Sequence, residues 1–99
     1  MPYAPFNLEG KVALVTGGNR GIGFGFAQAL YDAGAAVAIW GSNEKNNHEA
    51  VEKLGSGAKA WTVNVADEKQ VAEAMVDVVS HFGRIDSVFA NAGIGGGAK

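Results

Sequence analysis

Short apolar segments alternate with longer amphipathic segments along the chain. The apolar segments are five or six residues long, and three of the four are rich in β-branched or aromatic residues, which favours strands. The first two are almost continuously apolar, as is typical of central parallel strands covered on both faces. We predict β-strands at residues 11–15, 36–40, 58–63 and 85–90.

The segments between these strands repeat apolar residues every three or four positions, as amphipathic helices do. Each is followed by a glycine, which is a common helix stop, and two begin at a side chain suited to capping. We predict helices at residues 21–33, 43–54 and 67–82, with Asn43 and Asp67 as N-caps. The apolar stripe of the first helix comprises Ile22, Phe26, Ala29, Leu30 and Ala33, and that of the third comprises Val71, Met75, Val78, Val79 and Phe82.

Strands that alternate with helices predict an α/β fold, in which right-handed crossovers place helices on the faces of a parallel sheet. The 99 residues fit one domain, whose core is marginal unless something else covers it. A formal net charge of -2 gives no basic excess for a nucleic-acid or anionic-membrane partner. The chain has no cysteine, and no window approaches the ~20 apolar residues that span a bilayer. We therefore expect a cytoplasmic protein without a membrane segment.

A glycine-rich turn stands between the first predicted strand and the first predicted helix. It reads Thr-Gly-Gly-Asn-Arg-Gly-Ile-Gly over residues 16–23, with the spacing Gly-x-x-x-Gly-x-Gly. A helix N-terminus carries unpaired amides and a partial positive charge, and glycines let a phosphate approach the backbone. No Lys-Ser/Thr pair follows the glycines, which disfavours the phosphate loop of nucleoside triphosphatases. The turn thus predicts a pyrophosphate site, although a plain tight turn would also use glycine.

Two motifs together resemble the short-chain dehydrogenase/reductase family. The glycine turn follows the first predicted strand, and Asn91-Ala92-Gly93 follows the fourth; the lead-in at residues 8–15 and the turn at 82–86 are also similar. The resemblance extends from about Phe6 to Gly93. It implies a Rossmann-type doubly wound parallel sheet, of which these residues form the first four strands, in the order 3-2-1-4, with three helices.

The resemblance also implies which residues bind a nicotinamide dinucleotide. Residues of the glycine turn would wrap its pyrophosphate and adjoining ribose, and the motif after the fourth strand would line the other side. The residues concerned are Gly17, Asn19, Gly21, Ile22 and Gly23 in the turn, and Asn91, Ala92 and Gly93 after the fourth strand. The family motif often reads Asn-Asn-Ala-Gly, whereas this chain has Ala90 in its first position.

The choice between NAD and NADP depends on the end of the second strand. An acid there binds the adenosine ribose of NAD, but this chain has Gly41 and Ser42. Arg20 supplies a cation for a 2′-phosphate, with Ser42 and Asn43 as further donors, so we expect NADP, with NAD also possible. Asn64 and Val65 stand where the family has Asp-Val at the adenine edge. The missing acid also disfavours an S-adenosylmethionine-dependent methyltransferase.

The family's catalytic Ser and Tyr-x-x-x-Lys pair are not found in this sequence. Tyr3 and Tyr31 are followed four positions later by Asn7 and Ala35. His48 and His81 have no ligand partner at metal-binding spacing and are expected on the surface. We therefore assign no catalytic or metal-binding residue here.

We expect residues 1–99 to form part of a dinucleotide-binding domain from a longer chain, with a flexible glycine-rich tail at 94–99 and an exposed edge at the fourth strand. Alone, this truncated piece would be inactive. The intact protein would be a homo-oligomeric oxidoreductase that transfers hydride between the nicotinamide and a small carbonyl or alcohol substrate. The alternative is a noncatalytic nucleotide-binding or interaction module.

Overall fold

The computed structural model describes residues 7–19 and 21–91. In these residues it contains every predicted strand and helix, with bounds that differ from the predicted ones by at most two residues. The elements are β1 (Val12–Thr16), α1 (Gly21–Asp32), β2 (Ala36–Gly41), α2 (Glu44–Leu54), β3 (Ala58–Thr62), α3 (Glu68–Phe82) and β4 (Ser87–Ala90).

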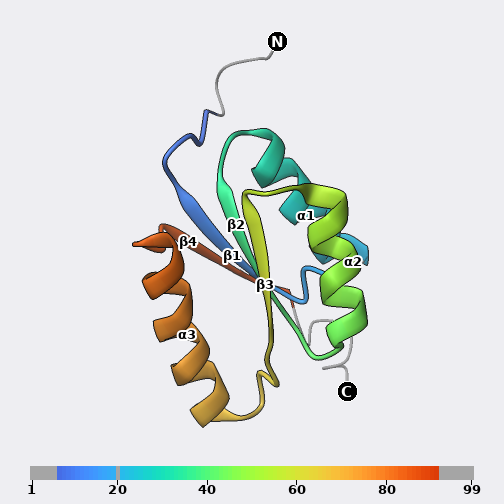
Figure 1. The fold of residues 1–99 in the computed structure, drawn as a ribbon, viewed down its shortest axis with the longest axis vertical. Helices are drawn as coiled ribbons and strands as arrows, with labels where there is room; N and C mark the ends of the chain where they lie inside the picture. Colours follow the sequence, from blue (N-terminus) through green and yellow to red (C-terminus); the bar gives the residue numbers. More distant parts are fainter. Residues whose placement is uncertain (1–6, 20, 92–99) are drawn as a thin grey trace.

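The four strands form one sheet in the order β3-β2-β1-β4, and every neighbouring pair is parallel. In register, Val15 of β1 lies beside Ile39 of β2 on one side and beside Phe89 of β4 on the other. Helices α1 and α2 cover one face of the sheet and α3 covers the opposite face (Figure 1). The predicted Rossmann-type arrangement of strands and helices is confirmed.

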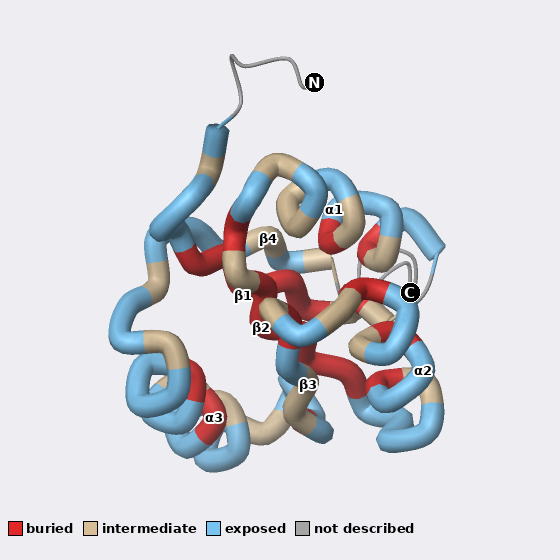
Figure 2. Tube along the Cα trace, turned by 45° about the horizontal axis from the view of Figure 1, so that its top comes forward, coloured by how far each residue is buried: buried red, intermediate tan, exposed pale blue. Residues whose placement is uncertain are grey.

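The core has two layers because residues of the central strands point alternately to the two faces. β1 is buried along its whole length, and β2 is buried from Val37 onward (Figure 2). Val15 and Ile39 pack toward α1 and α2, whereas Leu14 and Trp40 pack toward α3. This burial on both faces explains the continuous apolar sequence of the two strands.

The predicted N-caps of α2 and α3 are confirmed. The Asn43 side chain accepts a hydrogen bond from the Asn46 amide, and the Asp67 carboxylate accepts from the amides of Lys69 and Gln70. Helix α3 ends at Gly83, whose φ of 90° lies in the left-handed region that glycine favours. Local sequence signals therefore set the ends of both helices.

The predicted apolar stripe of α1 is wrong in its orientation. Gly23 and Ala27 are the buried residues of this helix, whereas Ile22 is 75% exposed and Phe26 is 47% exposed. The helix turns its smallest side chains to the sheet because the turn after β1 approaches its first residues too closely for larger ones. Phe26 instead stacks on Phe89 of β4, with ring centroids 5.7 Å apart.

β4 is the edge strand beside β1, and most of it is exposed, in agreement with the expected open edge. In α3, Ala74 and Val78 are buried and Val79 is 43% exposed, so the predicted stripe of this helix is only partly confirmed. The predicted tail at 94–99 lies outside the described residues.

Candidate functional site

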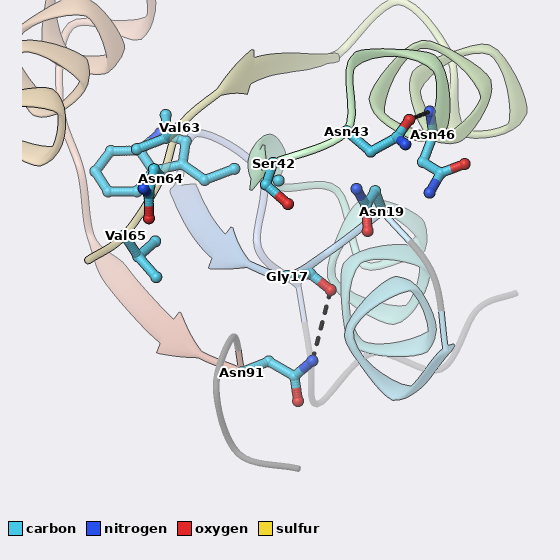
Figure 3. Close-up of a pocket in the computed structure, with 11 residues that line it drawn as sticks. Gly17, Asn19, Ser42, Asn43, Asn46, Val63, Asn64, Val65 and Asn91 are labelled. Atoms are coloured by element: carbon cyan, nitrogen blue, oxygen red, sulfur yellow. Dashed lines mark hydrogen bonds between the residues drawn. The ribbon is translucent and has the colours of Figure 1, made fainter. Parts of the chain in front are cut away.

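A pocket of about 390 Å³ lies where the carboxyl ends of the strands meet (Figure 3). It is lined by residues that follow or end all four strands, as expected for the ligand crevice of an open parallel sheet. The lining residues are Gly17, Asn19, Trp40, Gly41, Ser42, Asn43, Asn46, Val63, Asn64, Val65 and Asn91.

The glycine turn passes directly beneath the first turn of α1. Gly17 and Gly21 have φ angles of 70° and 64°, which residues other than glycine rarely adopt. A Cβ atom on Gly23 would collide with the Gly17 carbonyl oxygen and would lie 2.7 Å from Asn91 Nδ2. The sequence therefore needs glycine at these positions for the strand, the turn and the helix to meet.

The backbone amide of Gly17 joins the glycine turn to β2, because it donates a 2.7 Å hydrogen bond to the carbonyl oxygen of Trp40. It is consequently engaged within the protein. The donors available to an anion are at the start of α1, where the amides of Gly21, Ile22 and Gly23 have no acceptor within the helix. The first turn of α1 contains no acid, so a phosphate there would meet no carboxylate from this turn.

Asn91, after β4, closes the other side of the pocket. Its backbone amide donates to the Thr16 carbonyl oxygen at 3.2 Å, and its side-chain Nδ2 donates to the Gly17 carbonyl oxygen at 3.5 Å. Figure 3 shows this side-chain contact as the link between the end of β4 and the glycine turn. Asn91 thus links the end of β4 to the glycine turn.

A buried amide, Asn47 of α2, lies behind the pocket wall. Its side chain is hydrogen-bonded to the end of β2, to the end of β3 and to Asn19 of the glycine turn. The backbone of Gly41 passes beside this cluster, where a Cβ atom would collide with Asn19 Nδ2 and Asn47 Oδ1. The absence of a side chain at Gly41 therefore lets the two amides meet.

Every residue that lines the pocket in the described part of the chain is uncharged. Five of these residues contribute side-chain amides, which can both donate and accept hydrogen bonds. They are Asn19, Asn43, Asn46, Asn64 and Asn91. Trp40 forms part of the wall and is only 2% exposed. Its indole Nε1 is buried without a hydrogen-bond partner among the described residues, which is unusual for a buried donor.

The structure brings most of the predicted site residues together. Seven line the pocket: Gly17, Asn19, Ser42, Asn43, Asn64, Val65 and Asn91. Gly21, Ile22 and Gly23 lie in the first turn of α1 and do not line it. Arg20, Ala92 and Gly93 lie outside the described residues.

Sequence reasoning did not assign Asn46, Val63 or the buried Asn47 to the site. Asn46 and Asn47 are the third and fourth residues after the capping residue Asn43, in the first turn of α2. The position of Asn46 soon after the second strand is a signal that would have identified it, because segments at that end of a parallel sheet line the ligand crevice. The burial of Asn47 has no such local signal.

Other candidate chemistry is sparse in residues 7–19 and 21–91. His48 is exposed and pairs with Glu52 at 3.3 Å on the surface of α2. No group of three or more His, Asp or Glu side chains in these ranges is arranged to hold a metal ion. None of the three described helices is long and apolar enough to cross a membrane.

The strand order, the glycine turn after β1 and the pocket at the carboxyl ends of the four strands define a dinucleotide-binding fold of the Rossmann type. The family model for short chain dehydrogenase matches residues 11–99. The chain belongs to the short-chain dehydrogenase family.

Individual relatives agree with this family. The chain is 42% identical over 99 residues to the short chain dehydrogenase mdpC of Emericella nidulans, covering 93% of this chain and 36% of that protein. It is 45% identical over 93 residues to a probable NADP-dependent mannitol dehydrogenase of Yarrowia lipolytica, covering 90% of this chain and 33% of that one. The chain thus spans about a third of the length of the curated relatives it matches.

A solved structure with the same fold is 3-ketoacyl-(acyl-carrier-protein) reductase from Brucella melitensis, complexed with NADH. It superimposes with a TM-score of 0.79 at 33% sequence identity, over 82% of this chain and 34% of that one.

Proposed function

We propose that this protein is an NADP(H)-dependent oxidoreductase of the short-chain dehydrogenase/reductase type. The observation that carries the proposal is the glycine turn packed under the start of α1, beside a pocket at the carboxyl ends of the strands. When bound, the dinucleotide supplies hydride chemistry between its nicotinamide and a carbonyl or secondary alcohol. The chain's own residues bind and orient it.

The proposed contacts come from the first turn of α1 and from the pocket beside it. The free amides of Gly21, Ile22 and Gly23 hold the pyrophosphate, because they stand at a helix N-terminus with no acid in its first turn. Asn64 and Val65 line the far end of the pocket, after β3, where an adenine ring would lie. On the opposite side, Asn91 borders the dinucleotide. Ala92 and Gly93 are assigned to the dinucleotide from the sequence alone.

The preference for NADP is argued from the end of β2. The 2′-phosphate of NADP is disfavoured by a carboxylate at this place, and the chain has Gly41 and Ser42 instead. The neighbouring amides leave no space for a side chain at residue 41. Arg20 then supplies the positive charge, with Ser42 and Asn43 as neutral donors. The name of the Yarrowia lipolytica relative specifies NADP, whereas the Brucella melitensis structure contains NADH, so the preference rests on these residues.

The catalytic Ser and Tyr-x-x-x-Lys pair would come from residues beyond these 99. Support comes from the sequence, in which neither tyrosine is followed by lysine at the fourth position, and from the greater length of the relatives. A noncatalytic nucleotide-binding module is the alternative. A downstream Tyr-x-x-x-Lys segment in the coding sequence decides for the enzyme, whereas a natural stop codon after Lys99 favours the module.

The cofactor preference is tested by titrating the protein expressed from its complete coding sequence with NADPH and with NADH. We expect tighter binding of NADPH, and we expect Arg20→Ala to weaken it about tenfold while changing NADH little. Lys69→Ala, which removes the same charge from α3, is the control and should change neither. Equal or tighter NADH binding that Arg20→Ala leaves unchanged would reject the NADP assignment.

A further inference from the structure

The buried amide of Asn47 determines how the glycine turn presents a side chain to the pocket. Asn47 is 3% exposed and is the fourth residue after the N-cap of α2, on the side of the helix that faces the sheet. Burying a polar group costs free energy unless it is hydrogen-bonded, and here both ends of the amide have partners. The identity of those partners fixes the orientation of the amide.

The nitrogen end of Asn47 is fixed by groups that accept hydrogen bonds. Nδ2 donates to the carbonyl oxygen of Gly41 at 3.0 Å and to that of Trp61 at 3.3 Å. A backbone carbonyl oxygen has no proton to donate, so the atom that faces these two oxygens must be the nitrogen. Oδ1 of Asn47 therefore faces the other way, toward the glycine turn.

This orientation is passed on to Asn19. Because Oδ1 of Asn47 accepts, the partner atom on Asn19 must donate, and Asn19 Nδ2 lies 2.9 Å away. The remaining atom, Asn19 Oδ1, makes no hydrogen bond to a described residue, and Asn19 lines the pocket. The carbonyl oxygens of Gly41 and Trp61 thus fix the orientation of Asn47, and Asn47 in turn leaves Asn19 Oδ1 as a hydrogen-bond acceptor at the pocket.

We propose that Asn47 is a positioning residue of the dinucleotide site, which holds Asn19 so that Asn19 Oδ1 accepts a hydrogen bond from a hydroxyl of the adenosine ribose. This inference rests on the proposed function. The pocket wall near Asn19 includes Gly41 and Ser42 at the end of β2, which is where a Rossmann-type site holds that ribose. Asn47 acts through Asn19 and does not itself line the pocket.

The ribose 3′-hydroxyl is present in both NADP and NAD, so the loss of this contact should weaken both dinucleotides equally. That result differs from the expected effect of Arg20→Ala, which concerns NADPH alone. It also differs from general damage to the fold, because Asn47 and Asn19 both act on the ligand through the single hydrogen bond between Asn19 Oδ1 and the ribose hydroxyl. Removing either residue then has the same effect as removing both.

The experiment is a double-mutant cycle on the protein expressed from its complete coding sequence. The variants are Asn19→Ala, Asn47→Leu and their combination, with Glu49→Gln on the exposed side of α2 as the control. Leucine has the same number and branching of side-chain heavy atoms as asparagine, and its apolar side chain suits a buried site. Binding of NADPH and NADH is measured by fluorescence titration, and stability is measured by urea unfolding.

We expect each single variant to weaken both dinucleotides about tenfold, and the double variant to bind no more weakly than the weaker single one. Wild-type affinity in either single variant, or effects that multiply in the double variant, would overturn the positioning role. If Asn47→Leu does not unfold cooperatively, Gly41→Ala replaces it, because its Cβ atom separates the two amides. A wild-type protein that binds neither dinucleotide refutes the proposed function itself, which is a separate outcome.

Discussion

At the scale of single residues, two glycines of α1 have opposite surroundings. Gly23 is buried, and a Cβ atom there would collide with the Gly17 carbonyl oxygen. Gly25 is exposed, has no positive φ, and a Cβ atom there would have no described neighbour within 4 Å. Glycine is therefore required at one position and only costs helix stability at the other.

We predict that Gly23→Ala destabilises the protein by about 1–3 kcal/mol, because the backbone must shift to admit the methyl group. Gly25→Ala, the matched change in the same helix, should stabilise it by roughly 0.5–1 kcal/mol. Urea unfolding of both variants measures the difference. Equal midpoints for the two variants would contradict the close packing at Gly23.

Asn47 illustrates what sequence reasoning misses at this scale. In the sequence it stands among polar residues at the start of a predicted helix, which indicates a solvated position. Its burial depends on carbonyl groups from β2 and β3 and on the amide of Asn19. Those partners come together only in the folded sheet, so no local pattern can reveal them.

At the scale of elements, the turn between α3 and β4 is tied to the start of β1. The Asp86 carboxylate accepts a 2.8 Å hydrogen bond from the Val12 amide and a 2.7 Å bond from Arg84 Nη2. The hydrogen bond from Arg84 and then that from the Val12 backbone lower the pKa of Asp86 below its usual value. The carboxylate therefore fixes where β4 begins beside β1.

The lowered pKa predicts how this contact depends on pH. Its stabilisation is fully present above the unfolded pKa of about 3.9, and it is lost as pH falls through the lower folded pKa. Asp86→Asn should thus lower the urea midpoint at neutral pH, and the difference from wild type should shrink as the buffer is made acidic. Asp77→Asn, whose carboxylate bonds to no described residue, is the control; a difference independent of pH would contradict this account.

Elements were predictable from the sequence to different degrees. Apolar runs, caps and glycine stops are local signals, so strands and helices were placed to within two residues. The face that α1 turns to the sheet was not predictable, because apolar periodicity favours Ile22 and Phe26. The close approach of Gly17 to Gly23 overrides that preference. Tertiary contact thus decided the rotation of the helix about its axis.

At the scale of the whole molecule, large apolar side chains are exposed on α1, on α3 and on the edge strand β4. Val88 is 51% exposed on the edge strand, and Val76 is 67% exposed on the helix. An apolar hollow on α3 is lined by Met75, Val76, Val79 and Ser80. An unpaired edge next to exposed apolar side chains is a site of association with another chain or segment.

We predict that a protein consisting of these 99 residues alone self-associates as its concentration rises. The double variant Val76→Lys/Val88→Lys should shift it toward the monomer, because lysine is costly to bury in such a contact. His48→Lys, at an exposed position of α2, is the control. Sedimentation velocity gives the masses, and a wild-type monomer at every concentration, with a cooperative melt, would contradict the prediction.

The contact between Asn91 and Gly17 joins residues 74 positions apart in the sequence. A ribosome would release the glycine turn well before it adds the residue that braces it. During that interval β1 has β2 on one side and an open flank on the other, since β4 has yet to be translated. A ligand that binds both to the glycine turn and to the residues after β4 can stabilise only the complete sheet. The first steps of folding therefore proceed without stabilisation by the ligand.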